Sequence, residues 1–341
     1  MIDLRSDTKT LPTPAMREAM ARAECGDDVS REDPTVNRLE EMAAARIGKP
    51  AACFVCSGTQ GNLTALLALT HAGQALMCHD QAHVFFYEQG GYARLAGLAL
   101  YPLPGKYGVI DPEVLEEAFP PYEIHRVQPG LVALENTHNR AGGTVLTAAQ
   151  IAAVAEVAHR HGVPLHIDGA RIFNAATALG VTAAELAAPA DTITFCFSKG
   201  LGAPVGSIVC GEADVIERVR WARKILGGGL RQGGVIAAAC IVSLEQMIDR
   251  LGEDHAHARQ IAQTLAECPG IEVDLDSVQT NIIRFDVTRE DLDAASLCEK
   301  LKAHGVLGGP FSARAIRLVT HGDISAADTE TVCQVLREVL A

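Results

Sequence analysis

The sequence lacks both a long apolar run and an N-terminal targeting pattern. Its longest nearly unbroken apolar stretch, Val235 to Leu244, falls well short of the roughly 18 residues that a membrane-spanning helix needs. The N-terminus, MIDLRSDTKT, has no cationic start followed by an apolar run, so it does not resemble a secretory signal peptide. We therefore expect a cytoplasmic protein without a membrane partner.

Basic residues are also fewer than acidic ones. The 29 lysines and arginines face 42 aspartates and glutamates, which gives a formal net charge of −13. Such an acidic chain lacks the electrostatic footprint of a nucleic-acid-binding protein. Ten cysteines are scattered along the chain, which without a secretory signal favours free thiols over a disulfide framework. Cys53 and Cys56 form one C-x-x-C with no second pair to complete a zinc site, so we favour core packing and predict no metal site.

The middle of the chain alternates between strand and helix patterns, with no internal repeat or low-complexity tract. That alternation is typical of an α/β fold with a mostly parallel central sheet. Apolar runs predict strands at 51–56, 163–167, 192–197 and 205–210. Helical spacing predicts helices at 62–69 and from 151 to Gly162, the second preceded by Thr147 and Gln150 at the spacing of a capping box.

The C-terminal part has a different order of predicted strands and helices. Strands are predicted at 271–275, 281–287 and 315–320, with a helix at 291–304 and a final helix capped by Ser325. We expect a small α+β domain over 251–341 and a large domain over 1–250 that includes the N-terminal arm. The boundary rests on a long helix predicted from about Gly234 onward.

Three predicted strands end in polar or glycine-rich segments, which are Ser57 to Gly61, Asp168 to Arg171 and Ser198 to Gly202. In an open α/β sheet, ligands bind at the carboxyl ends of the strands. The first segment would bring a helix N-terminus to a phosphate group, although a plain tight turn explains it equally well. It matches neither G-x-G-x-x-G nor a Walker sequence, so a nucleotide site is not favoured.

Asp168 and Lys199 are each ambiguous when taken alone. A carboxylate directly after a buried strand needs a cation or hydrogen bonds, and an ion pair between Asp168 and Arg171 would satisfy it. Lys199 is either an exposed loop lysine or a partly desolvated amine suited to forming a Schiff base. An anion cradle, an acid and a lysine at strand ends of one sheet are together what pyridoxal phosphate requires. The combination therefore predicts a pyridoxal phosphate site.

Longer motifs narrow this prediction. Eight segments run in order from Ile2 to His321, namely IDLRSDTKT, GDDVSREDPTVNRLE, SGTQGN, LENTHN, HIDGARIFNA, FSKGLGAPVGS, GGGLRQGG and RLVTH. They resemble the low-specificity L-threonine aldolase family over nearly the whole chain. The resemblance implies the fold of the aspartate-aminotransferase-like (fold type I) pyridoxal phosphate enzymes. It also implies a cytoplasmic homotetramer with active sites at subunit interfaces.

The resemblance implies roles for individual residues. Lys199, His83 and His125 are the implied catalytic residues, and Ser6, Tyr87, Arg171 and Arg317 are implied to bind the substrate. The implied cofactor-binding residues are the Schiff-base Lys199, the ring-nitrogen partner Asp168, the ring-stacking His83, Arg171, Gly58, Thr59, Ser198, and Lys224 and Arg231 from a neighbouring subunit. Taken alone, His83 is also consistent with a satisfied core histidine. Gly227 to Gly229 are also consistent with a flexible loop, although Arg231 after them favours a segment that approaches an anion.

The implied reaction is the reversible cleavage of L-threonine, L-allo-threonine and related β-hydroxy-α-amino acids to glycine and an aldehyde. Racemisation, transamination or β-elimination on the same scaffold are the alternatives, because they differ only in which Cα bond is aligned for cleavage. The chain departs from the family at Ser30, where a tyrosine is common, and at Arg31, where a glycine is common. We expect this change to affect substrate preference and not cofactor binding.

Overall fold

The computed structural model describes residues 1–341 and contains a central seven-stranded sheet. Its strands lie in the order β2 (Ala51–Val55), β10 (Ser207–Gly211), β9 (Thr192–Cys196), β8 (Leu165–Asp168), β7 (Pro129–Glu135), β3 (Ala75–His79) and β4 (Ala99–Leu103). Every strand is parallel to its neighbours except β10, which is antiparallel to both β2 and β9. The predicted mostly parallel α/β sheet is therefore confirmed.

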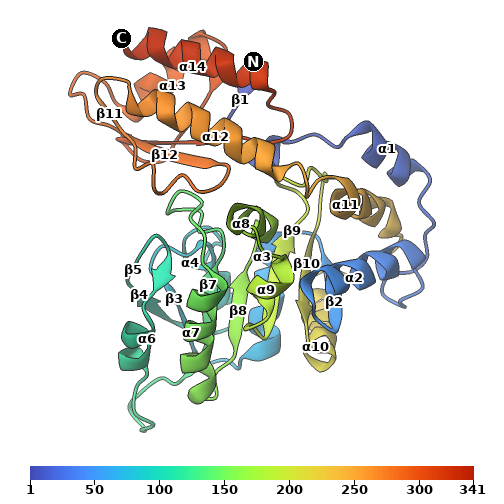
Figure 1. Cartoon of the computed structure of the whole chain (residues 1–341). Helices are drawn as coiled ribbons and strands as arrows, with labels where there is room; N and C mark the ends of the chain where they lie inside the picture. Colours follow the sequence, from blue (N-terminus) through green and yellow to red (C-terminus); the bar gives the residue numbers. More distant parts are fainter.

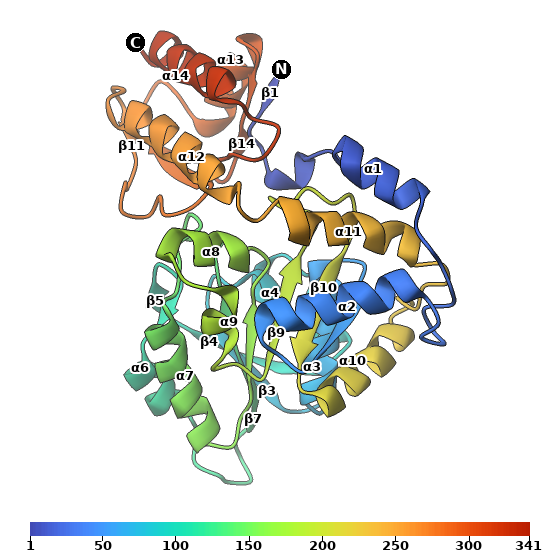
Figure 2. The ribbon, with the colours of Figure 1, turned by 45° about the vertical axis from the view of Figure 1, so that its right-hand side comes forward.

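Helices cover both faces of this sheet, as Figures 1 and 2 show. Alternate strand residues point to opposite faces. Ile193 and Phe195 of β9 thus join the largest apolar cluster, and Val209 of β10 joins a cluster on the other face. The first face is covered by α2 (Pro34–Ile47), α7 (Ala148–Arg160), α8 (Ile172–Leu179), α9 (Ala183–Ala187) and α11 (Gly234–Gln246). The second is covered by α3 (Gly58–Leu69), α4 (His83–Phe86), α5 (Gly91–Arg94) and α10 (Ala213–Ile225).

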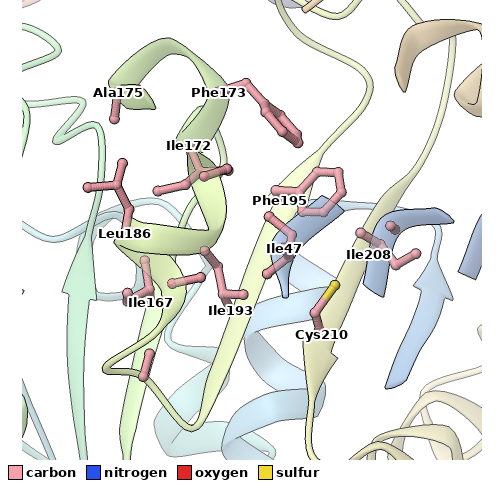
Figure 3. Close-up of a cluster of buried hydrophobic side chains, with 14 of the residues drawn as sticks. Ile47, Ile167, Ile172, Phe173, Ala175, Leu186, Ile193, Phe195, Ile208 and Cys210 are labelled. Carbon is pink, nitrogen blue, oxygen red and sulfur yellow. The ribbon is translucent and has the colours of Figure 1, made fainter. Parts of the chain in front are cut away.

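Figure 3 shows the centre of the first cluster, where Phe173 and Ile172 of α8 lie over Phe195, Ile193 and Ile167 of the sheet. Phe173 and Phe195 meet edge to face with ring centroids 5.1 Å apart. This packing anchors α8 directly after the end of β8. It therefore holds the segment from Asp168 to Arg171 in one conformation.

The C-terminal part lies above the large domain in Figure 1 and contains a second, smaller apolar cluster. Its sheet has the order β11 (Ile271–Glu272), β12 (Ile282–Val287), β15 (Ala315–Val319), β14 (Gly309–Pro310). It packs against α12 (Leu251–Ala266), α13 (Ala294–Ala303) and α14 (Ala326–Leu340). Further elements are α1 (Pro14–Ala21), α6 (Pro112–Ala118), the hairpin of β5 (Gly105–Lys106) and β6 (Val109–Ile110), and a 3₁₀ turn at Asp7–Lys9. No helix has both the length and the apolar composition needed to cross a membrane.

Two details differ from the sequence-based expectation. The long helix predicted from Gly234 is two helices, α11 and α12, separated at residues 247–250. The N-terminal arm, which we expected to belong to the large domain, pairs with the small one through β1 (Ile2–Asp3) and β13 (Val306–Leu307). Leu4 continues into the small apolar cluster. We retain a boundary near residue 250 as a proposal, with residues 2–4 assigned to the C-terminal part.

Candidate active site

A pocket of about 460 Å³ opens where the central strands end below the small domain. It brings together six residues expected from the sequence, namely Ser6, His83, Tyr87, Arg171, Lys199 and Arg317. The other lining residues are Arg5, Thr8, Asn139, Gly309, Pro310 and Phe311. The pocket is thus built by the large domain on one side and by both chain ends on the other.

Lys199 lies half-buried just after β9, in the turn that begins at Ser198. Its backbone carbonyl accepts a hydrogen bond from Thr10 Oγ1 at 3.1 Å, and its side-chain amine makes no hydrogen bond or ion pair within the chain. A lysine in this position offers a free amine to a ligand in the pocket. The geometry suits covalent attachment of an aldehyde.

Asp168 lies at the end of β8 and is 6% exposed. Its Oδ2 accepts from Asn62 Nδ2 at 2.8 Å, and its Oδ1 accepts from the Ala170 N–H at 3.1 Å. Burial would raise the pKa of Asp168, but the charges of His83 and Lys199 and the Asn62 hydrogen bond hold that pKa below its ordinary value. Asp168 is therefore ionised with no cation bonded to it, which fits a protonated ring nitrogen as its partner.

The N-terminus of α3 also fits an anionic group. Ser57 caps this helix by accepting from the Gln60 N–H, while the N–H groups of Gly58 and Thr59 make no hydrogen bond in the chain. A Cβ at Gly58 would lie 2.8 Å from Cys196 Sγ, so the close packing of this turn on β9 requires glycine. Two free N–H groups at the positive end of a helix form a phosphate cradle.

Arg171 does not pair with Asp168, the partner that the sequence suggested. Its guanidinium forms a two-pronged ion pair with Asp7, at 2.6 and 2.7 Å, in which both side chains are buried. Burial would lower the pKa of Arg171, but the Asp7 charge raises it above its ordinary value. For Asp7, the charge and hydrogen bonds of Arg171 overcome burial and hold the pKa well below its ordinary range. Arg171 lines the pocket with its charge already balanced.

Arg317 has no acidic partner. Its Nη1 donates to Asn139 Oδ1 at 2.7 Å and its Nη2 donates to the Arg5 carbonyl at 3.4 Å. Burial and the nearby Arg171 lower the pKa of Arg317, with Asp7 acting in the opposite direction. A carboxylate in the pocket would therefore find an arginine whose charge is not yet balanced.

His83 begins α4 beside this group. Its backbone N–H donates to Glu135 Oε2 at 2.7 Å, its Nδ1 lies 2.8 Å from Glu88 Oε1, and its ring centroid lies 5.3 Å from that of Tyr87. It lines both the main pocket and a small hollow that contains Asp168. A planar ring that reached from Lys199 toward Asp168 would pass this imidazole.

The structure does not bring His125 to the pocket. His125 lies in an exposed loop that precedes β7. Because the strands around it are parallel, the start of β7 is at the opposite edge of the sheet from the end of β9. Within one chain, the expected catalytic role of His125 is therefore not supported.

Lys224 and Arg231 also lie away from the chain's own pocket. Lys224 lines a surface hollow with Val29, Arg31 and Trp221, and Arg231 pairs with Asp27 at 2.9 Å. Ser30 is exposed in the same region, and Arg31 pairs with Glu217. Arg31 has a φ of 61°, a left-handed conformation that a glycine adopts without strain. This explains why a glycine is suited to that position.

Sequence reasoning missed several residues of the site, above all Asp7, Asn62, Glu88 and Asn139. Asp7, Asn62 and Asn139 lie inside the motifs IDLRSDTKT, SGTQGN and LENTHN, and Glu88 lies five residues after His83. Membership of a motif, or closeness to His83 along the chain, was the available signal. Their roles depend on contacts with residues far along the chain, such as Asp7 with Arg171 and Asn62 with Asp168.

Comparison with known proteins agrees with this geometry. The beta-eliminating lyase family matches residues 3–288. The low-specificity L-threonine aldolase of Escherichia coli K12 is 41% identical over the whole length of both chains. The low-specificity L-threonine aldolase 1 of Arabidopsis thaliana is 43% identical over 96% of this chain and 93% of its own.

The chain belongs to the threonine aldolase family. Among solved structures, the threonine aldolase of Leishmania major superposes over the full length of both chains with a TM-score of 0.86 at 20% identity. A serine palmitoyltransferase of Sphingomonas wittichii matches 99% of this chain and 86% of its own, with a TM-score of 0.79 at 17% identity. The expected fold type I architecture is thus confirmed, and the pocket of this threonine aldolase family member lies where the fold presents its strand ends.

Proposed function

We propose that this protein is a pyridoxal phosphate-dependent aldolase that cleaves L-threonine, L-allo-threonine and related β-hydroxy-α-amino acids reversibly to glycine and an aldehyde. One observation carries the proposal: a free lysine and an arginine without an acidic partner line one pocket, and His83 lines both this pocket and the small hollow that contains the ionised, buried Asp168. The whole-length likeness to low-specificity L-threonine aldolases supports it. Nothing in the pocket favours racemisation, transamination or β-elimination instead.

The residues present fit pyridoxal phosphate. Lys199 would hold the cofactor covalently, Asp168 would pair with its ring nitrogen, and His83 would stack on its ring. Gly58 and Thr59, with the adjacent Ser198, would hold its phosphate. When bound, the cofactor accepts the electron pair that is released as the Cα–Cβ bond breaks.

The protein's own residues then bind and orient the substrate. The Arg317 guanidinium grips the α-carboxylate, assisted by Ser6 and by Arg171, whose position Asp7 fixes. Tyr87 forms a wall for the β-substituent. His83 accepts the β-hydroxyl proton, directly or through a water molecule, so that the aldehyde carbonyl forms.

The proposal extends to a cytoplasmic homotetramer in which neighbouring subunits complete each site. Trp221 is 75% exposed and Ile225 is 81% exposed beside Lys224, which is an apolar surface uncommon on a free monomer. Lys224 and Arg231 would act on a neighbour's pocket from this surface. A role for His125 likewise requires a second copy of the chain.

The direct test is an assay of glycine and aldehyde release from threonine, allo-threonine and phenylserine by protein purified with the cofactor. We expect equal amounts of the two products and a visible absorption band from the bound cofactor. Release of a 2-keto acid, or of an amino acid epimerised at Cα, would instead support one of the alternative reactions.

A further inference from the structure

A chain of hydrogen bonds joins His83 to Asp168 beneath the pocket. Glu88 Oε1 lies 2.8 Å from His83 Nδ1 and accepts from Asn62 Nδ2 at 2.9 Å. The same Asn62 nitrogen donates to Asp168 Oδ2 at 2.8 Å. The Glu88 side chain is only 3% exposed, and Asn62 is 2% exposed. His83, expected to stack on the cofactor ring, and Asp168, expected to pair with the ring nitrogen, are therefore connected through two buried side chains.

A hydrogen bond with His166 fixes the orientation of the Asn62 side-chain amide. His166 Nε2 lies 3.1 Å from Asn62 Oδ1, and His166 Nδ1 lies 2.8 Å from Thr192 Oγ1. Burial lowers the pKa of His166 to about 4, so its ring is neutral. With Nε2 as the donor to the Asn62 oxygen and Nδ1 accepting from the Thr192 hydroxyl, all partners are satisfied. The amide nitrogen of Asn62 then faces the two carboxylates with one hydrogen for each.

The contact with Glu88 determines which nitrogen of His83 is basic. The Glu88 Oε1 atom that faces His83 Nδ1 already accepts a hydrogen bond from Asn62 Nδ2, so Oε1 acts as an acceptor and His83 Nδ1 carries the hydrogen in this contact. The lone pair of the neutral ring is then on Nε2. A carboxylate bound to the far nitrogen also raises the basicity of the near one, as in other histidine–carboxylate pairs.

The carboxylates around His83 also favour a basic ring. Glu88 follows α4, Glu135 comes from β7 and Asp168 from β8, while Lys199, Arg171 and Arg317 line the pocket side. Burial would lower the pKa of His83, but the Glu88 hydrogen bond and the three carboxylates outweigh it and raise the pKa. Burial and the Asp168 charge also raise the pKa of Glu88.

His83, Glu88 and Asp168 place their polar atoms within 4.8 Å of one another, which also resembles a metal site. The position of Asn62 argues against that interpretation. Its N–H groups already occupy the oxygens of both carboxylates that face the centre of the group. A cation there would meet amide hydrogens, so a hydrogen-bonded network explains the cluster better.

We propose that Glu88 is a positioning residue that keeps the Nε2 atom of His83 available as the base, and that Asn62 holds Glu88 and Asp168 in place for this role. The catalytic part of this inference rests on the proposed aldolase function. The protonation of His83 does not, because it can be measured without turnover.

The test measures the pKa of His83 in the holoenzyme from the pH dependence of deuterium exchange at its ring Cε1–H, followed by peptide mass spectrometry. Glu88→Gln removes the charge at nearly constant shape, so we expect the His83 pKa to fall by about one unit or more. Asn62→Asp adds a carboxylate beside Glu88, so we expect the His83 pKa to rise. Glu117→Gln makes the first change at an exposed glutamate and serves as the matched control. The exposed His71 and His304 are internal references in every sample.

Opposite shifts of the His83 pKa in the two variants distinguish a positioning role of Glu88 from a general loss of structure. If the substitutions merely loosened the fold, both variants would move the His83 pKa toward that of the exposed histidines. The acidic limb of the kcat/KM profile for threonine should follow the His83 pKa to lower pH in Glu88→Gln. An unchanged His83 pKa in Glu88→Gln, or a shift in the same direction in both variants, would overturn the inference. Opposite shifts in a protein that does not cleave threonine would support the inference while refuting the proposed function.

Discussion

The two sides of the pocket use their charges differently. On the sheet side, Arg171 is neutralised by the buried Asp7, and Asp168 is held by Asn62. On the side built by the chain ends, Arg317 bonds only to an amide oxygen and a backbone carbonyl. A balanced buried charge stabilises one arrangement of the fold, whereas an unbalanced one remains available to a ligand. The Arg171–Asp7 pair therefore holds the site in shape, whereas Arg317 is left to bind the substrate.

The largest effect is expected on the sheet side, at Lys199. Lys199→Ala should abolish turnover and leave any cofactor bound only non-covalently, because no other lysine lines the pocket. Borohydride reduction of the wild-type protein followed by peptide mapping identifies the attachment site. A stable adduct on a different lysine would refute the assignment.

The next largest effect is expected on stability, at Asp7. Asp7→Asn leaves Arg171 buried without a counter-charge, which typically costs about 3–5 kcal/mol of unfolding free energy. Asp3→Asn is the matched control, because its partner Arg5 is half-exposed and the pair should contribute much less. Denaturant unfolding at pH 7 measures both losses.

The loss of stability in Asp7→Asn should depend on pH. The pKa of Asp7 is lowered in the folded state, so its stabilisation is present above the unfolded-state pKa of about 3.9 and is lost as the pH falls below that value. The difference between wild type and Asp7→Asn should therefore shrink below about pH 4. A difference that stayed constant from pH 7 to pH 3 would show that the Asp7 charge is not responsible.

On the chain-end side, Arg317→Lys should reduce binding and not stability. Lysine cannot reproduce the paired hydrogen bonds of a guanidinium to a carboxylate. We expect kcat/KM to fall by about 10-fold or more, since a charged hydrogen bond contributes about 1.5–3 kcal/mol. The fall should be similar for threonine, allo-threonine and phenylserine, because all three share the α-carboxylate. Arg284→Lys makes the same change at the exposed residue paired with Arg317 across β12 and β15 and serves as the control. A strong change in the ratio between substrates would place Arg317 near the β-substituent instead.

The smallest effect is expected at Ser30, which lies outside both sides of the chain's own pocket. In the proposed homotetramer, Ser30 lies on the same surface as Lys224 and Arg231. We expect Ser30→Tyr to change the ratio of kcat/KM between phenylserine and threonine by about two- to tenfold, because specificity reflects relative transition-state binding. Equal scaling of all substrates would contradict this, and a fully active monomer in sedimentation experiments would contradict the proposed assembly.

The sequence by itself determined the local chemistry of the site. Asp168 and Lys199 follow buried strands of a mostly parallel sheet, and such strands present their carboxyl ends at one edge. The motifs around them were sufficient to predict the fold class, the family and six residues of the pocket. These features depend on short segments whose residues are neighbours along the chain.

Only the tertiary structure decided the partners of these residues. Arg171 bonds Asp7 and not the nearby Asp168, and Asn62 bonds Asp168 across 106 residues of sequence. His125 lies at the far edge of the sheet although its motif suggested the site. The pairing of β1 with β13 carries Ser6 toward Arg317 from the other end of the chain. Such contacts depend on strand order and domain packing. These bring together segments that are far apart along the chain, and the separation along the sequence does not reveal their distance in space.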